Sequence, residues 1–247
     1  MTPLPAPASD WAYFLDLDGT LVGFARAPSA VHIDRRLRGL VQDLHRSAGG
    51  ALAVITGRRI VDIDGLFPGT RLAAAGLHGI ERRTASGRLA RHRFPAGRLD
   101  DVRHRLAAAA ARHPRLLVED KGIAVAVHYR RAPRLGGYAH RLVRGMLARL
   151  GAEYCLQAGK LVVEIRPAGR DKGIAIREFM RERPFQGRIP VFIGDDATDE
   201  YGFAVINRLG GYSVKVGAGR TAARWRLRDV RSVRAWLRLG ANGGRTR

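Results

Sequence analysis

Short apolar runs that end in polar residues constrain the fold of this chain most strongly. Residues 11–18 (WAYFLDLD) are apolar and aromatic-rich and end abruptly in acids and Gly19, and the next such run is Ala51–Thr56. Between the two runs, four apolar residues recur at helical spacing: Leu37, Leu40, Val41 and Leu44. Buried parallel strands have this near-continuous apolar character, and they open into functional loops at their carboxyl ends. The opening unit is therefore predicted to be strand, helix, strand.

The same alternation returns further along the chain. Strands are expected at Arg71–Ala75, Val191–Gly194 and Tyr212–Val216, and helices at about Lys172–Arg183, Asp199–Leu209 and Val230–Leu239. Strands that alternate with helices in this way form a parallel sheet with helices on both faces. The predicted fold class is α/β, with a Rossmann-like parallel sheet.

The segment 84–165 has a different texture. A helix is expected around Leu106–Ala111 and another at about Tyr138–Leu150, with short strands at Leu116–Glu119, Ile123–Tyr129, Glu153–Gln157 and Leu161–Ile165. A hairpin-rich segment between two halves of a parallel sheet indicates an inserted domain. We therefore expect a disordered lead over residues 1–10, a core domain over 11–83 and 166–247, and an inserted α+β domain over 84–165.

Length and cysteine content limit the class of protein. A chain of 247 residues can bury a large core without disulfides, and Cys155 is the only cysteine, as suits a reducing cytosol. The N-terminus has neither the basic segment nor the apolar stretch of a signal peptide, and no run approaches the roughly 20 apolar residues of a membrane helix. We expect a cytoplasmic protein with no membrane partner.

The formal net charge of +22 invites a nucleic-acid interpretation. Only four of the 44 basic residues are lysines, and the arginines are scattered through the expected helices rather than gathered in one block. The sequence shows no helix-turn-helix signature, zinc-ligand pattern or interleaved aromatic platform. An arginine-biased proteome, or attraction of a phosphorylated substrate, explains the charge better, and we do not expect a nucleic-acid partner.

Acidic residues follow two of the predicted strands. Asp16 can attack phosphorus and ligate a metal, while Asp18 can deliver a proton to the leaving oxygen. Gly19 permits the tight turn, and its backbone N–H can face a phosphate oxygen. The segment Gly194-Asp195-Asp196-Ala197-Thr198-Asp199-Glu200 carries four acids. This density is costly unless a hard cation is bound, and oxygen ligands suit Mg²⁺. The alternative interpretation is that each loop caps the element after it.

Two further polar residues follow predicted strands or open helices. Thr56, in Thr56-Gly57-Arg58, can donate to a phosphate oxygen, or it can serve only as a helix N-cap. Lys172 starts a helix, where its charge opposes the helix dipole and calls for a negative partner that a bound phosphate would supply. Each signal is weak alone.

These four motifs, taken in order, resemble those of the haloacid dehalogenase superfamily of phosphotransferases. The insertion between the second and third motifs matches members with a C2 cap. The resemblance implies a Rossmann-like parallel-sheet haloacid dehalogenase core with an inserted α+β cap domain.

Further motifs narrow the resemblance to trehalose-6-phosphate phosphatases. They are Gly76-Leu77-His78-Gly79-Ile80-Glu81, Glu119-x-Lys121, His128-Tyr129-Arg130, Glu164-x-Arg166-Pro167 and the extended acidic motif Gly194-Asp195-Asp196-x-Thr198-Asp199-Glu200. The match spans about residues 12–240 and weakens at Val22–Ser29 and Thr84–Leu99.

The resemblance implies a role for each matching residue. Asp16 would be the nucleophile and Asp18 the general acid and base, and Thr56 and Lys172 would hold the phosphoryl group. Mg²⁺ would be the cofactor: Asp16, Asp18 through its carbonyl, and Asp195 would be its protein ligands, and Asp196 and Asp199 would orient the metal shell. Substrate contacts would come from Gly19, Arg58, His78, Glu119, Lys121, Arg130 and Glu164. Either His78 or His128 could instead be a satisfied structural histidine.

The leading function hypothesis is Mg²⁺-dependent hydrolysis of trehalose 6-phosphate through an aspartyl-phosphate, with the substrate's synthase as a candidate partner. The second is a related capped phosphatase acting on another sugar phosphate, because substrate choice is set outside the fold itself. The third is a non-catalytic binding protein. Intact Asp16, Asp18, Lys172 and Asp195 argue against the third, since a silent copy would be free to lose any of them.

Overall fold

The computed structural model describes residues 3–25, 27–92 and 99–242. The chain divides into two compact units, each considered separately below. The core unit comprises Met1–Ala25, Val31–Arg91 and Asp171–Arg247, and the small unit comprises Arg26–Ala30 and His92–Arg170. The main part of the small unit is thus inserted in the sequence of the core unit. It begins at His92 and ends at Arg170, whereas the inserted domain was expected over 84–165, and the unit also takes in Arg26–Ala30, which were expected in the core domain.

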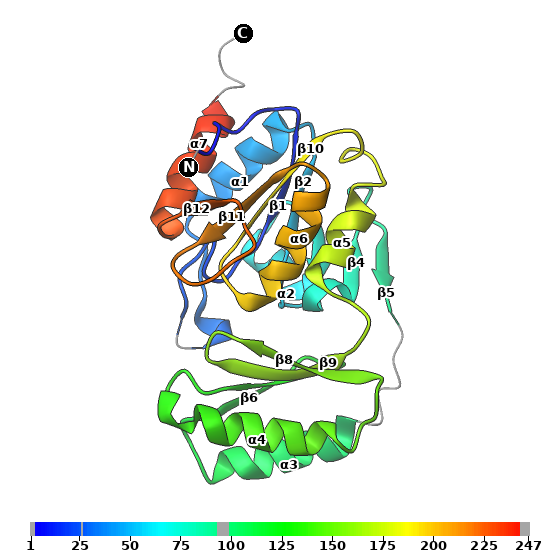
Figure 1. The fold of residues 1–247 in the computed structure, drawn as a ribbon, viewed down its shortest axis with the longest axis vertical. Coiled ribbons are helices and arrows are strands. Elements are labelled where there is room, and N and C mark those ends of the chain that lie inside the picture. The colour runs from blue at the N-terminus through cyan, green and yellow to red at the C-terminus, as the bar shows by residue number, and fades with distance from the viewer. Residues whose placement is uncertain (1–2, 26, 93–98, 243–247) are drawn as a thin grey trace. The chain divides into compact units, whose positions relative to one another are not determined.

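An eight-stranded sheet forms the centre of the core unit (Figure 1). Its strands in spatial order are β12 (Trp225–Leu227), β11 (Tyr212–Val216), β10 (Ile189–Gly194), β1 (Trp11–Leu15), β2 (Leu52–Ile55), β3 (Ala73–Gly76), β4 (Glu81–Arg83) and β5 (Leu89–Arg91). The first six are parallel, and β4 and β5 add an antiparallel hairpin. The predicted α/β class with a parallel sheet is confirmed.

Helices cover both faces of this sheet. They are α1 (Arg35–Ser47), α2 (Ile60–Leu66), α5 (Lys172–Phe179), α6 (Glu200–Arg208) and α7 (Val230–Asn242), with short 3-10 helices η2 (Leu77–Gly79) and η5 (Ala197–Asp199). Helix α1 packs with α7, and α5 packs with α6 on the other face (Figure 1). All five residues of β1 are buried, which explains the continuous apolar run in the sequence.

The N-terminal residues pack against α7. The indole Nε1 of Trp236 donates to the carbonyl of Pro5 at 2.9 Å, and Pro7 is buried against Gly240, where a Cβ would lie 2.5 Å from the Pro7 Cβ. The absence of a side chain at Gly240 in α7 therefore leaves the space that Pro7 occupies. This packing contrasts with the disordered lead expected over residues 1–10, of which residues 1–2 lie outside the described part of the chain.

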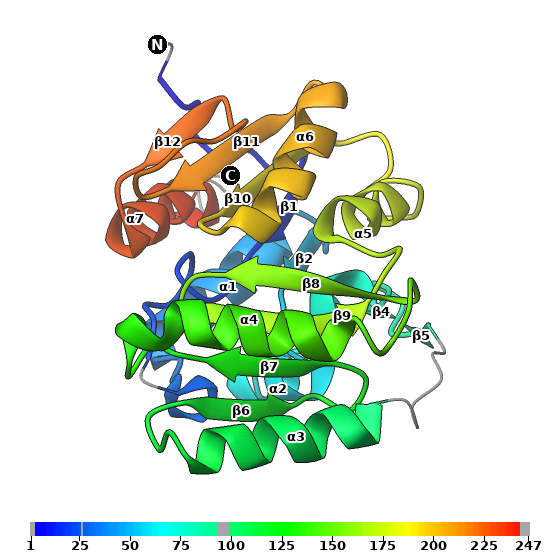
Figure 2. The same ribbon diagram turned by 60° about the horizontal axis from the view of Figure 1, so that its bottom comes forward.

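The small unit is a four-stranded antiparallel sheet with two helices on one face (Figure 2). Its elements are α3 (Asp100–Ala111), β6 (Leu117–Asp120), β7 (Val125–His128), η4 (Pro133–Leu135), α4 (Gly136–Leu147), β8 (Tyr154–Gly159) and β9 (Val162–Pro167), with η1 (Pro28–Ala30) assigned to the same unit. The spatial order is β6-β7-β9-β8. Val127, Val163 and Ile165 point into the helical layer, so alternate residues point to the opposite face.

Candidate active site

An acid cluster lies at the carboxyl ends of two adjacent parallel strands. Asp16 follows β1 and Asp195 follows β10, and Asp199 lies in η5 just beyond. One carboxylate oxygen from each of the three lies within 4.8 Å of the others. The strand register explains the meeting, because Leu15 pairs with Ile193 and the Asp16 N–H donates to the Ile193 carbonyl at 3.0 Å.

Two glycines make room for the acid cluster. A Cβ on Gly19, whose φ is +90°, would lie 2.3 Å from Oδ2 of Asp195. A Cβ on Gly194 would lie 2.3 Å from Cγ of Asp199. Neither position can therefore carry a side chain without displacing a carboxylate. The N–H of Gly19 donates to the Val22 carbonyl at 2.7 Å, so the expectation that this N–H faces a phosphate is not met in this structure.

Lys172 joins two members of the acid cluster. It is the first residue of α5, fixed there because the N-cap Asp171 accepts from the Ile174 N–H at 2.8 Å. Its Nζ donates to Oδ1 of Asp16 at 2.8 Å and to Oδ1 of Asp199 at 2.7 Å. The side chain is only 3% exposed, so both ion pairs are shielded from solvent.

The electrostatics of the cluster leave an excess of negative charge. Burial raises the pKa of Asp16 well above its ordinary value, Lys172 opposes the rise, and Asp199 and Asp195 add to it. Burial alone would lower the pKa of Lys172, but the carboxylates of Asp16 and Asp199 together hold it above its usual range. Asp16 and Asp199 are buried and Asp195 is partly buried, and these three carboxylates outnumber Lys172, the ammonium that is bonded to two of them. Their carboxylate oxygens, which lie within 4.8 Å of one another, are of the type that a hard divalent cation prefers.

Asp18, expected to ligate the metal through its carbonyl, and Asp196, expected to orient the metal shell, direct their carboxylates to other partners. Oδ2 and Oδ1 of Asp18 accept from Nε and Nη2 of Arg58 at 2.7 and 2.8 Å, a bidentate pair. Oδ1 of Asp196 accepts from the Ala197 N–H at 2.7 Å and caps η5. Among the described residues, the cluster of acids within 4.8 Å of one another contains Asp16, Asp195 and Asp199, three of the five residues predicted for the metal site.

Thr56 and Arg58 lie in the loop between β2 and α2. The hydroxyl of Thr56 is buried and accepts from the Arg58 N–H at 3.3 Å, and the N-cap of α2 is Arg59. Thr56 is thus not the N-cap of that helix, which was the alternative to a phosphate-binding role.

A strained turn at Leu77 and His78 is hydrogen-bonded to the loop that contains Thr56. Leu77 and His78 both have positive φ, 49° and 56°, which costs of order 1–3 kcal/mol for each non-glycine residue. Their N–H groups donate to the carbonyls of Arg58 and Thr56 at 2.8 and 3.0 Å. The buried His78 ring lies against Gly57, where a Cβ would be 2.8 Å from Nε2. This contact supports a structural role for His78, which was expected to touch substrate.

Glu81 also holds this loop. It ends the motif Gly76-Leu77-His78-Gly79-Ile80-Glu81 but was not predicted as a site residue. Its Oε2 accepts from the Ile60 N–H at 2.9 Å, and its Oε1 pairs with Nε of Arg91 at 3.0 Å. The carboxylate is buried and caps the first turn of α2. Glu81 therefore fixes the helix that follows Thr56 and Arg58.

The remaining predicted residues belong to the small unit. Lys121 Nζ pairs with Oε2 of Glu164 at 2.8 Å, with side chains only 9% and 5% exposed. Glu119 Oε2 lies 2.7 Å from Nε2 of His128, and Arg130 Nη2 donates to the Lys160 carbonyl at 3.3 Å.

Strand register places the two glutamates on one face of the small sheet. Glu119 and Glu164 both pair with Ala126, from opposite sides, and Gln157 pairs with Glu164. This row lies on the face opposite the apolar side chains that pack on α3 and α4. The small unit thus presents carboxylate, ammonium and amide groups on a single sheet face.

The fold is shared with solved structures of other proteins. A haloacid dehalogenase-like hydrolase from Bacteroides thetaiotaomicron superposes with a TM-score of 0.63 at 16% identity, covering 92% of this chain and 97% of that chain. The C-terminal domain of C. albicans trehalose-6-phosphate phosphatase superposes with a TM-score of 0.85 at 21% identity, covering 95% and 93%. The core unit with its acid cluster is therefore a haloacid dehalogenase-like fold.

The sequence comparisons give the family. The family profile described as Trehalose-phosphatase matches residues 14–231. The trehalose-6-phosphate phosphatase of Escherichia coli (strain K12) is 44% identical over 240 residues, which cover 97% of this chain and 90% of the relative. This chain belongs to the trehalose-phosphatase family, and the resemblance predicted from its motifs is confirmed. Among the residues that the structure describes, no helix has the length and apolar character needed to cross a membrane.

Proposed function

We propose that this chain is a phosphoric monoester hydrolase that converts trehalose 6-phosphate to trehalose and phosphate, with Mg²⁺ as cofactor. The observation that carries the proposal is the buried bridge from Asp16 through Lys172 to Asp199. It holds a carboxylate nucleophile beside a fixed cation, in a chain of the trehalose-phosphatase family. The same bridge is difficult to reconcile with a non-catalytic binding protein, which would gain nothing from a buried, crowded carboxylate.

The first half of the reaction forms a covalent intermediate on Asp16. A carboxylate oxygen of Asp16 forms a bond to phosphorus while the bond from phosphorus to the sugar oxygen breaks. Asp18, as the protonated acid, gives its proton to that leaving oxygen. Lys172 and Thr56 hold the phosphoryl oxygens. In this structure Arg58 orients the Asp18 carboxylate, so we propose that Arg58 acts first on the acid rather than on the sugar.

The second half regenerates the free Asp16 carboxylate and the protonated Asp18. Asp18 takes a proton from a water molecule as the water oxygen bonds to phosphorus, and the bond from phosphorus to Asp16 breaks. Mg²⁺ bound by Asp16 and Asp195 would neutralise charge on the phosphoryl group and on the acid cluster. Asp199 supports the site by fixing Lys172, while Asp18 and Asp196 would contribute through their backbone or by orienting the other ligands.

Sugar recognition is proposed for the small unit, acting as the cap. Glu119 and Glu164 offer carboxylate oxygens that accept hydrogen bonds from hydroxyl groups, and Lys121 and Arg130 offer donors. The register of β6, β7, β9 and β8 supports this role, because it gathers the acidic and amide groups on one face.

The proposed setting is the cytoplasm, which suits the unpaired thiol of Cys155. The proposed partner protein is the synthase that supplies the substrate by glycosyl transfer. Both assignments depend on the proposed substrate.

Phosphate release from a panel of sugar phosphates, with Mg²⁺ and with excess chelator, tests the proposal. We expect the highest kcat/KM for trehalose 6-phosphate and no turnover in chelator. A preference for another sugar phosphate would assign the chain to a related capped phosphatase. Turnover that persists in excess chelator would contradict the metal assignment.

A further inference from the structure

Lysine is rare in this chain, and its few positions are informative. Among 44 basic residues only Lys121, Lys160, Lys172 and Lys215 are lysines. Lys172 lies in the acid cluster, Lys121 forms the buried pair with Glu164, and Lys215 is only 6% exposed. In a buried position a lysine offers a compact ammonium, whereas an arginine offers a larger planar fork. Lys215 has no role in the mechanism above.

Lys215 contacts the backbone of the acid cluster. It lies on β11, where it pairs with Gly194, the residue just before Asp195. Its Nζ donates to the backbone carbonyl of Asp195. A buried ammonium requires such an acceptor, because an unpaired buried charge is costly.

The same peptide unit is held from its other side. The N–H of Asp196 belongs to the peptide whose carbonyl accepts from Lys215, and it donates to Oδ2 of Asp199 at 2.8 Å. The peptide plane between Asp195 and Asp196 is therefore clamped at both its carbonyl and its N–H. Rotation of this peptide would break both hydrogen bonds.

The clamp continues to the proposed nucleophile. The other oxygen of Asp199, Oδ1, accepts from Lys172 Nζ at 2.7 Å, and Lys172 donates in turn to Asp16 Oδ1 at 2.8 Å. Asp199 is fully buried, so it has no solvent to replace a lost partner. A continuous chain of hydrogen bonds thus runs from β11 to Asp16.

We infer that Lys215 is a positioning residue of this site. It fixes the peptide between Asp195 and Asp196, and through Asp199 it fixes the ammonium of Lys172 against Asp16. The inference rests on the proposed function for its effect on turnover, but its structural content stands on the contacts alone. Lys215 is not proposed to touch the phosphoryl group or the leaving oxygen.

The test compares two removal variants, one rescue variant and one control. Lys215→Met and Lys215→Gln remove the charge, Lys215→Arg keeps a charged donor, and Lys160→Met makes the same chemical change at an exposed lysine. Hydrogen–deuterium exchange measures protection of the Asp196 amide, read from peptides spanning residues 195–200. Steady-state kinetics with p-nitrophenyl phosphate at saturating Mg²⁺ measures kcat and KM separately.

We expect exchange over residues 195–200 to rise about tenfold or more in both removal variants, with kcat lower by about ten- to a hundredfold and KM little changed. Lys215→Arg should recover part of the kcat, and Lys160→Met should match the wild type. A merely structural role would raise exchange throughout the core unit and leave the kcat of the folded fraction unchanged.

Wild-type exchange and wild-type kcat in both removal variants would overturn the inference. If Lys215→Met does not fold, Lys215→Gln, which keeps a neutral donor group, decides the question. If the wild type itself has no phosphatase activity, the proposed function fails, and the exchange measurement still decides whether Lys215 holds the peptide.

Discussion

Replacing Glu164 with alanine should destabilise the small unit by about 3–5 kcal/mol. The change leaves the Lys121 ammonium, 2.8 Å from its lost partner and with a side chain only 9% exposed, buried without that carboxylate. Removing one member of a buried ion pair costs this much because the remaining charge keeps its desolvation penalty. Since a small domain has a total stability of only about 5–15 kcal/mol, the loss is a large fraction of it.

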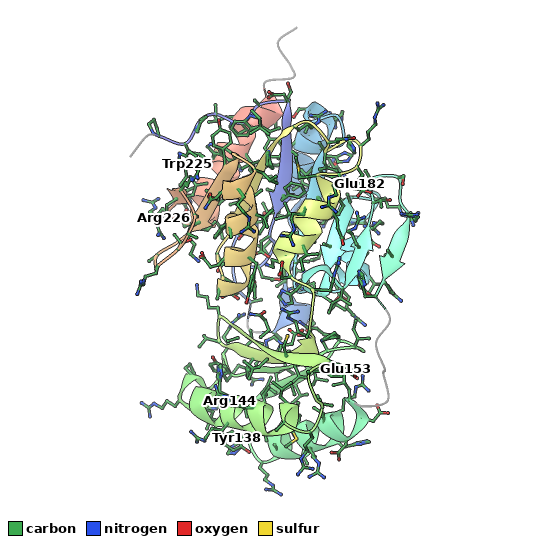
Figure 3. All side chains as sticks on the ribbon, turned by 45° about the vertical axis from the view of Figure 1, so that its right-hand side comes forward. Tyr138, Arg144, Glu153, Glu182, Trp225 and Arg226 are labelled. Atoms are coloured by element: carbon green, nitrogen blue, oxygen red, sulfur yellow. The ribbon has the colours of Figure 1, made fainter. Side chains whose placement is uncertain are left out.

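The positions of the tryptophans give a clean assay. All three, Trp11, Trp225 and Trp236, belong to the core unit. The ring centroid of Tyr212 lies 4.5 Å from that of Trp11, on which it stacks, and 5.0 Å from that of Trp225, which is labelled in Figure 3. Tryptophan fluorescence therefore follows unfolding of the core unit alone, whereas far-UV circular dichroism follows both units. In Glu164→Ala, the part of the circular dichroism signal that comes from the small unit should have its urea unfolding midpoint lowered by about 2 M. The urea midpoint followed by fluorescence should not change.

A double variant separates stability from recognition. Lys121→Met with Glu164→Leu replaces the ion pair by apolar groups, which is often neutral or stabilising, so the small unit should regain its wild-type midpoint. The double variant should nevertheless lose activity on trehalose 6-phosphate and keep activity on p-nitrophenyl phosphate. A wild-type midpoint in Glu164→Ala would refute the reasoning, because it would mean that Lys121 does not depend on this carboxylate.

Substitutions at four further positions probe the core unit. Asp16→Asn should abolish turnover and trapping by beryllium fluoride without lowering the Tm, since it neutralises one of three crowded carboxylates; full activity would contradict the nucleophile assignment. Glu81→Ala should lower kcat by about tenfold or more while Glu81→Gln, which keeps the acceptor for the Ile60 N–H, loses less; equal losses would argue against the cap. Asp34→Ala should cost about 1 kcal/mol in urea unfolding because it removes the N-cap of α1; no change would mean that water replaces the cap. Hydrogen bonds from the Ser232 N–H and hydroxyl lower the pKa of Asp229 to about 2. The contribution of Asp229 to the free energy of unfolding is therefore complete above pH of about 4 and is lost as pH falls toward 2. Asp229→Asn should make the free energy of unfolding less dependent on pH in this range, and an unchanged slope would show that Asp229 is not the group responsible.

The parts of the fold that sequence predicts are those whose pattern is local. The long apolar strands and the amphipathic α1 follow from burial, and the structure has them within a few residues of the predicted bounds. The strands β4, β5 and β12 were not predicted. Each has three residues and at least one arginine, and each is a strand because its backbone pairs with a neighbour rather than because its own sequence favours burial.

In the site, the sequence pattern predicts the positions of the strands but not the partners of the side chains. Asp16 and Asp195 meet because their strands are adjacent and parallel, which the sequence pattern predicts. The carboxylate of Asp18 turns to a nearby guanidinium instead, and spacing along the chain does not reveal such a partner. Lys215 was not predicted as a site residue, because a lysine that alternates with apolar residues in a strand is typical of a solvated face.

The division of residues between the two units has a consequence for how specificity can change. Every group proposed to act on phosphorus, namely Asp16, Asp18, Thr56 and Lys172, belongs to the core unit, and so do Lys215 and Glu81, which hold these groups in place. The groups proposed to bind sugar belong to the small unit. Substitutions on the polar face of the small sheet can therefore alter the substrate without disturbing the network around Asp16. Substitutions at Lys215 or Glu81 should instead affect all substrates by the same factor, because the chemistry that they support is common to every phosphate ester.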